Sequence, residues 1–325
     1  MRRRELVPIL AGAMISAGPI CAQRKAMPVV GYLGNASPKS AASFLAAFRQ
    51  GLSDTGFTEG KNVTIDYRWA EGHYDRLPAF AAEFVSRKVD VILATAGVGI
   101  AAAKGSTSTI PIVFFGGDDL VSAGLVASLA RPGGNLTGFS IFAPELNPKR
   151  LQLLSELVPH VQDIAFLVNP TGSSLDLVIR DVEEAARESG RRLFIVKASA
   201  DTEIDQAFAT FVQLRAGGLA VTADPFFNSR REQIVALAAR YAVPAIYEWR
   251  EFASAGGLIS YGPIMTDGIR QVGVYVGQVL AGASPADLPI QRPTRLELVV
   301  NLNAARALGL TIPPSILARA DEVIE

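Results

Sequence analysis

The chain has 325 residues, of which 49% are apolar and 19% charged, and its 31 basic and 31 acidic side chains balance to zero net charge. A chain of this length and composition can bury one or two sizeable cores, which excludes an intrinsically disordered protein. The charge balance offers no broad attraction to nucleic acid or anionic membrane, so we expect neither as a partner.

Residues 1–22 have the order of an export signal. Arg2, Arg3 and Arg4 precede an apolar segment broken by glycine and proline, and Ala22 is a small residue before the expected cut. The segment is too short and interrupted for a good membrane span. We predict a signal peptide cleaved near Ala22 and a periplasmic protein, exported by either the general or the twin-arginine route.

Cys21 is the one cysteine of the chain, and it precedes the expected cut. The mature chain therefore has no disulfide framework and no thiolate for a metal or a nucleophile. A lipoprotein would carry its lipid on Cys21, but Ile20 is bulky where a small residue is needed. Removing residues 1–22, with their three arginines and one glutamate, leaves 28 basic and 30 acidic side chains.

The first half of the mature chain alternates apolar, strand-like runs with helical patterns. Residues 40–55, for example, place their large apolar side chains on one stripe and end at Gly56. Repeated β-α units indicate a parallel sheet covered by helices on both faces. The expected strands are 28–34, 62–70, 89–95 and 110–115, and the expected helices are 40–55, 76–87, 98–104 and 120–130.

The same alternation starts again near residue 148 and predicts a second sheet of similar size. The expected strands are 163–169, 192–198, 218–224 and 244–248, and the expected helices are 148–158, 175–189, 204–214 and 230–241.

Three strand-like segments, 136–142, 258–264 and 288–295, suit passages of the chain between the two halves. Helix 268–280 would then return to the first half. We therefore predict an α/β fold of two doubly wound parallel-sheet lobes joined by three hinge crossovers, which permits closure over a ligand in the cleft between the lobes. Lobe 1 is expected at 28–138 and 265–290, and lobe 2 at 139–264 and 291–325.

Several long motifs occur in order along this chain: GDDLVSAGLVASLARPGGNLTGFS, GGLISYGP, GQVLAGASPADLPIQRPTRLELVVNLNAARALGLTIPP and ADEVIE. Together they resemble the ABC-transporter substrate-binding family that includes tryptophan- and tyrosine-binding proteins. The resemblance covers nearly the whole mature chain. It implies a type I periplasmic binding protein, which holds a small solute between two lobes and delivers it to a membrane permease. One departure is Asp118-Asp119, where the family pattern usually has Asp-Pro.

Candidate ligand-binding residues follow from the position of the cleft, which lies outside the carboxyl ends of the strands. Asn35 and Ser37 follow the first strand. Ala96 and Gly97 begin a helix, whose N-terminal N–H groups can take a carboxylate. Asp118 follows the fourth strand, where it can accept an ammonium group or cap the helix expected next.

In the second half, Asp224 and Asn169 hold equivalent positions at strand ends. Asp224 is a second candidate for an ammonium group, and either residue could instead close a turn. Aromatic side chains near the same edge would suit a flat or apolar solute, although such residues more often belong to the core. Phe115, Phe226, Tyr247, Trp249 and Tyr261 are in such positions, with Tyr247 and Tyr261 taken as ligand contacts and Tyr261 as the first choice.

A catalytic or metal site is not indicated. The two histidines, His73 and His160, have no spacing that would build a metal site or a Ser-His-acid relay. We therefore expect no cofactor, no metal and no enzyme activity. The sequence predicts a monomeric, exported receptor of an ABC importer for an amino acid or an aromatic or apolar acid. A periplasmic sensor subunit of a signalling system is the alternative, and an enzyme is a distant third.

Overall fold

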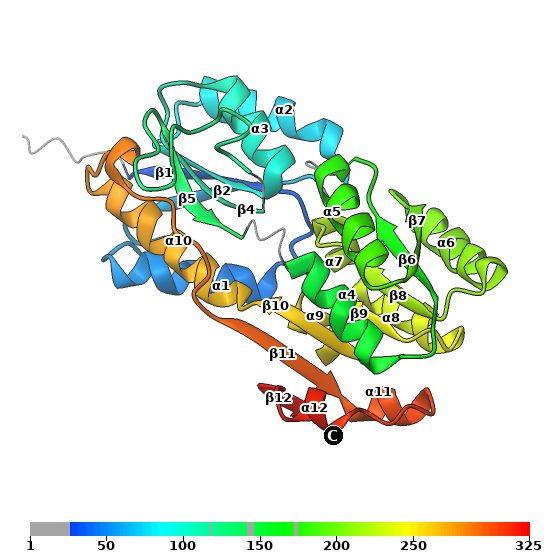
Figure 1. The fold of residues 1–325 in the computed structure, drawn as a ribbon. Helices are drawn as coiled ribbons and strands as arrows, with labels where there is room; N and C mark the ends of the chain where they lie inside the picture. The colour runs from blue at the N-terminus through cyan, green and yellow to red at the C-terminus, as the bar shows by residue number, and fades with distance from the viewer. Residues whose placement is uncertain (1–26, 118, 142–145, 172–174) are drawn as a thin grey trace, which may run out of the picture.

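The computed structural model describes residues 27–117, 119–141, 146–171 and 175–325. The expected signal peptide, Cys21 and Asp118 lie outside these residues. The described part of the chain forms two parallel sheets, each covered by helices (Figure 1). An α/β fold with helices and strands in alternation is therefore confirmed.

The first sheet has five parallel strands in the order β2-β1-β3-β4-β5. Its central strands are apolar and buried because helices cover both faces. The strands are β1 (Val29–Gly34), β2 (Thr64–Trp69), β3 (Val91–Thr95), β4 (Ile112–Gly116) and β5 (Leu136–Ser140).

Alternate side chains of this sheet pack against different helices. Val30 and Leu93 share a core with α1 (Ala42–Asp54) and α10 (Met265–Leu280). Leu33 and Ile92 share another with α2 (Leu77–Ser86) and α3 (Ala96–Ser106). This alternation of contacts is what a strand covered on both faces requires. We refer to the first sheet and these helices as lobe 1.

The second sheet has seven strands in the order β12-β11-β10-β9-β8-β6-β7. All neighbours are parallel except β10 and β11. The strands are β6 (Asp163–Val168), β7 (Arg192–Lys197), β8 (Gly218–Val221), β9 (Ala245–Tyr247), β10 (Ile259–Pro263), β11 (Leu296–Asn301) and β12 (Glu322–Ile324).

Helices cover both faces of the second sheet as well, and together they form lobe 2. One core contains side chains of α4 (Leu146–Leu157), α5 (Leu175–Glu188), α11 (Leu302–Ala307) and α12 (Pro314–Leu317). The other contains side chains of α6 (Asp201–Leu214), α7 (Pro225–Ser229), α8 (Arg231–Arg240) and α9 (Arg250–Ser254). Two short 3₁₀ helices, η1 (Tyr74–Arg76) and η2 (Pro285–Asp287), belong to connections.

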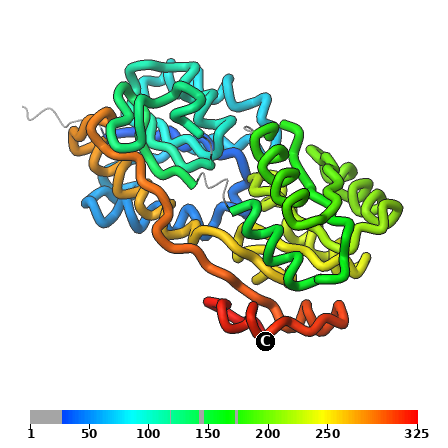
Figure 2. The backbone as a smooth tube through the Cα atoms, viewed as in Figure 1, coloured from blue at the N-terminus to red at the C-terminus, as the bar shows by residue number. Residues whose placement is uncertain are grey.

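The chain passes between the lobes three times, after β5, after β10 and before β11 (Figure 2). After the second passage α10 packs against α1, β4 and β5. On the third, Gln291 pairs with Phe139 at the end of β5 before β11 joins the second sheet. The lobe boundaries expected at residues 138, 264 and 290 stay predictions.

Residues 120–130 do not form the helix that their amphipathic pattern predicts. They form successive turns, in which Gly124 has the left-handed φ of 67°. Glycine adopts that conformation readily, and the turns end before Pro132, which also cannot extend a helix. Among the residues that the structure describes, we find no helix with the length and apolar composition to cross a membrane.

Candidate functional site

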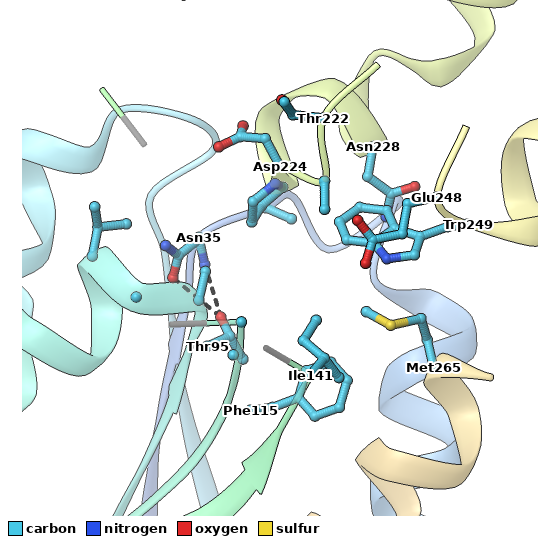
Figure 3. A pocket seen from close by; sticks show the side chains of 18 of the residues that line it. Asn35, Thr95, Phe115, Ile141, Thr222, Asp224, Asn228, Glu248, Trp249 and Met265 are labelled. Atoms are coloured by element: carbon cyan, nitrogen blue, oxygen red, sulfur yellow. Dashed lines mark hydrogen bonds between the residues drawn. The ribbon is translucent and has the colours of Figure 1, made fainter. Parts of the chain in front are cut away.

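A cavity of about 190 Å³ lies between the two sheets and is lined by residues of both lobes. Its walls are strand ends, because β1, β3, β4 and β5 point at it from lobe 1, and β6, β8 and β9 from lobe 2. Figure 3 shows Asn35 and Thr95 on one side, and Asn228, Glu248 and Trp249 on the other. This is the edge of a parallel α/β sheet at which ligands bind.

The lobe 1 wall contains the start of α3 and the side chain of Asn35. The Thr95 hydroxyl accepts a hydrogen bond from the Asn35 N–H and lies within donating distance of the Leu33 carbonyl and Asn35 Oδ1. It therefore does not cap α3. Ala96 and Gly97, the first helical residues, line the cavity. Uncapped N–H groups and the positive end of the helix dipole favour an anionic group here.

Asp224 lies on the lobe 2 wall and is tied to both lobes. Its Oδ1 accepts hydrogen bonds from the Phe226 N–H (2.8 Å), from Asn169 Nδ2 (3.0 Å) and from the Tyr74 hydroxyl of lobe 1 (3.0 Å). Burial raises the pKa of Asp224, although these hydrogen bonds oppose the shift. The carboxylate therefore caps α7 and also joins the two walls.

Arg150 and Glu248 form a buried ion pair in the cavity lining. Arg150 Nη2 lies 3.3 Å from Glu248 Oε2, and Nη1 donates to the Tyr261 carbonyl at 3.2 Å. Burial raises the pKa of Glu248 and lowers that of Arg150, while their attraction opposes both shifts. Arg150 thus connects α4, which follows the first passage between lobes, to β10, which precedes the second.

Three lining side chains have a buried polar atom that bonds to no other atom among the described residues. They are Asn35 Nδ2, Asn228 Oδ1 and Trp249 Nε1. A buried polar atom without a partner costs about 1–3 kcal/mol, so such atoms are rare outside functional sites. Two are donors and one is an acceptor, and they are divided between the walls.

Five of the nine residues selected from the sequence line this cavity: Asn35, Ala96, Gly97, Asn169 and Asp224. They come from four strand ends on two sheets, which the fold brings to one place. Of the five aromatic residues near strand ends, Phe115 and Trp249 line the cavity as well.

The other selected residues lie elsewhere. Ser37 is absent from the lining and bonds with Ser40 in the turn before α1. Tyr247 is fully buried and stacks on Phe252, with ring centroids 4.6 Å apart. Tyr261 pairs with Leu298 and packs against the core of lobe 2. Asp118 lies outside the described residues.

Sequence reasoning overlooked several lining residues. Glu248 directly follows β9, so the rule that selected Asp224 would have found it. Trp69 ends β2 and gives the same signal. Tyr74 and Arg150 lie on η1 and α4, away from strand ends, and no local pattern marks them.

Comparisons with known proteins agree with this architecture. A tyrosine-binding protein of Clostridioides difficile (strain R20291) is 28% identical over 269 residues, covering 81% of this chain and 75% of that protein. The structure is similar to that of an ABC domain from Streptococcus pneumonia in complex with L-Trp. That similarity has a TM-score of 0.82 and 25% identity, over 91% of this chain and 99% of the other.

A ligand-free, open structure of a substrate binding protein from Clostridium difficile has a TM-score of 0.64. It is 24% identical and covers the same shares of the two chains, 91% and 99%. The family model described as ABC transporter substrate binding protein matches residues 37–324. This range includes every strand of the two sheets except β1, and all the described residues of the cavity lining except Tyr32, Asn35 and Ala36. With that match over most of its length, the chain belongs to the ABC transporter substrate binding protein family.

Proposed function

We propose that this protein is the exported receptor of an ABC importer and captures an aromatic amino acid between its two lobes. The observation that carries the proposal is the cavity between the sheets, which combines aromatic walls with a few polar groups on each side. That combination is typical of small-molecule sites. The tyrosine and L-Trp named for two similar proteins support an aromatic amino acid over a simple aromatic acid.

The charges in the cavity suit a zwitterion. On lobe 1, the start of α3 and Asn35 Nδ2 suit the ligand carboxylate. On lobe 2, Asp224 supplies a carboxylate that suits its ammonium group. A simple aromatic acid would leave Asp224 without a cationic partner. Of the residues selected from the sequence, we propose Asn35, Ala96, Gly97, Asn169 and Asp224 as ligand contacts.

The closed arrangement of the lobes supports capture by enclosure. The hydrogen bond from Tyr74 to Asp224 connects the lobes across the cavity. The TM-score is 0.82 against the structure with bound L-Trp and 0.64 against the ligand-free, open one, at nearly equal identity and coverage. We therefore infer that the lobes open to admit the solute and close to hold it.

The expected signal peptide, with Arg2–Arg4 before an apolar segment, supports export to the periplasm. A receptor there would deliver its solute to a membrane permease, and we propose that it does so as a monomer. No part of this account requires a cofactor or nucleic acid.

A thermal-shift screen of residues 23–325 against amino acids, aromatic acids and nucleosides tests the proposal. A solute at about 100 times its dissociation constant adds roughly 2.7 kcal/mol to the free energy of unfolding. We expect this stabilisation from an aromatic amino acid and not from its deaminated acid. Stabilisation by a nucleoside alone, or by no amino acid, would overturn the proposed ligand class.

A further inference from the structure

The lobe 2 wall of the cavity contains a polar cluster opposite Asn35. Asn228, Glu248 and Trp249, which we call the Glu248 cluster, face the cavity from α7 and from the end of β9 (Figure 3). The cluster is buried, since these residues are 4%, 8% and 5% exposed. The ring of Trp249 belongs to the hydrophobic core, but packing requires neither the amide of Asn228 nor the carboxylate of Glu248 at these buried positions.

The hydrogen-bonding capacity of the cluster is largely unused. Asn228 Oδ1 and Trp249 Nε1 have no partner among the described residues. The Glu248 carboxylate has Arg150 at 3.3 Å, but no hydrogen bond within the described part of the chain. The cluster therefore presents one free donor together with free acceptor capacity, which a ligand group can satisfy.

The chemistry of the cluster limits what that ligand group can be. A carboxylate has no hydrogen to donate to Asn228 Oδ1, and an ammonium group could not accept from Trp249 Nε1. A methyl or phenyl edge would leave all the polar atoms unpaired. A hydroxyl group can donate to Asn228 or Glu248 and accept from Trp249 at the same time.

The region between the two polar walls is apolar. Phe115 and Ile141 line the cavity below the space between Asn35 and the Glu248 cluster, and Met265 lies below Trp249 (Figure 3). A ligand with its carboxylate at Asn35 and α3 would place an apolar body against these side chains. Its far end would then reach the cluster.

We propose that the Glu248 cluster recognises a hydroxyl group on the aromatic ring of the ligand, so that the receptor selects a hydroxyphenyl amino acid over a phenyl one. This inference rests on the proposed function and adds to it the residues that set specificity. The ring hydroxyl pairs with Asn228 and Trp249, and Arg150 holds Glu248 in place beside them.

Isothermal titration of residues 23–325 with L-tyrosine and with L-phenylalanine tests this inference. We expect L-tyrosine to bind at least about tenfold more tightly, because a site built to hydrogen-bond a hydroxyl rejects the analogue that lacks it. Asn228→Leu keeps the side-chain size. It should lower the affinity for L-tyrosine at least about fivefold, while the affinity for L-phenylalanine changes less than about twofold. Trp249→Phe should likewise reduce the ratio of the affinity for L-tyrosine to the affinity for L-phenylalanine.

Gln206→Leu is the matched control, since Gln206 is exposed on α6 of the same lobe and should leave both affinities unchanged. Equal wild-type affinities for the two amino acids would overturn this inference and leave the proposed function intact. An equal loss of affinity for both amino acids in Asn228→Leu would also overturn it, because the cluster would then contact a part of the ligand that L-tyrosine and L-phenylalanine have in common. Binding of no aromatic amino acid would overturn both.

Discussion

At the residue scale, Asp224 combines two roles that the sequence offered as alternatives. It caps α7 through the Phe226 N–H, and it accepts the Tyr74 hydroxyl from the opposite lobe. The strand-end rule that selected it is reliable because parallel strands bring their carboxyl ends to one edge. The rule does not decide which of two adjacent residues faces the cleft.

Tyr247 and Glu248 show the limit of that rule. Successive side chains of an extended chain point to opposite faces, so Tyr247 packs in the core and Glu248 lines the cavity. The sequence indicates where this strand ends only to within a residue or so. A shift of one residue would exchange the positions of Tyr247 and Glu248. Tyr261 was selected on a hinge strand, and that strand directs it to the core of lobe 2.

The raised pKa of Asp224 gives a pH dependence with a defined sign. Its pKa lies above the ordinary value of 3.8 because of burial, so the folded protein holds the proton more tightly than the unfolded chain. Wild type should therefore lose stability relative to Asp224→Asn as the pH rises from 3.8 through the folded pKa.

Thermal unfolding of both proteins across that range measures the difference in Tm, and the shared contribution of other groups cancels. Asparagine retains an acceptor for Phe226, Asn169 and Tyr74, so the fold should survive the change. If the Tm of wild type instead rose relative to that of Asp224→Asn as the pH rises, the raised pKa of Asp224 would be contradicted.

At the scale of elements, the sequence predicts buried strands better than turns or helix contacts. The run 110–115 matches β4 closely, because few structures besides a buried strand suit so short an apolar run between a proline and glycines. The pattern over 120–130 is amphipathic and predicts a helix, yet these residues form turns, with Gly124 in the left-handed conformation. Which helix packs on which depends on distant partners, as with α1 and α10.

The contact between α1 and α10 depends on glycine. A Cβ on Gly273 would lie 2.2 Å from the Phe48 carbonyl oxygen, so Gly273→Ala must push the helices apart. We expect a loss of about 1–3 kcal/mol in the free energy of unfolding, measured by urea denaturation.

Gly105 is the matched control, because it lies in α3 with no atom near its Cβ position. Gly105→Ala should be neutral or stabilise by up to about 1 kcal/mol. If both substitutions changed stability equally, the close packing of α1 and α10 would not be the cause.

At the scale of the whole molecule, two lobes joined by three passages allow binding and release without chemistry. Membership of a substrate-binding family confirms the expectation of a binding protein rather than an enzyme. In the described residues no group of three or more His, Cys, Asp or Glu side chains is arranged to hold a metal ion. The sequence predicted this architecture from its doubled pattern, whereas the ligand contacts depend on how the lobes meet.

The central claim, that a solute is held between the lobes, has a direct reporter. The chain has two tryptophans, Trp69 and Trp249, and both line the cavity. Tryptophan emission can be excited selectively while L-tyrosine is added, with calorimetry on the same samples. We predict one saturable change in emission, with the same affinity as the heat signal and with a smaller amplitude in Trp249→Phe. Saturable heat with unchanged tryptophan emission would place the ligand elsewhere and contradict the account.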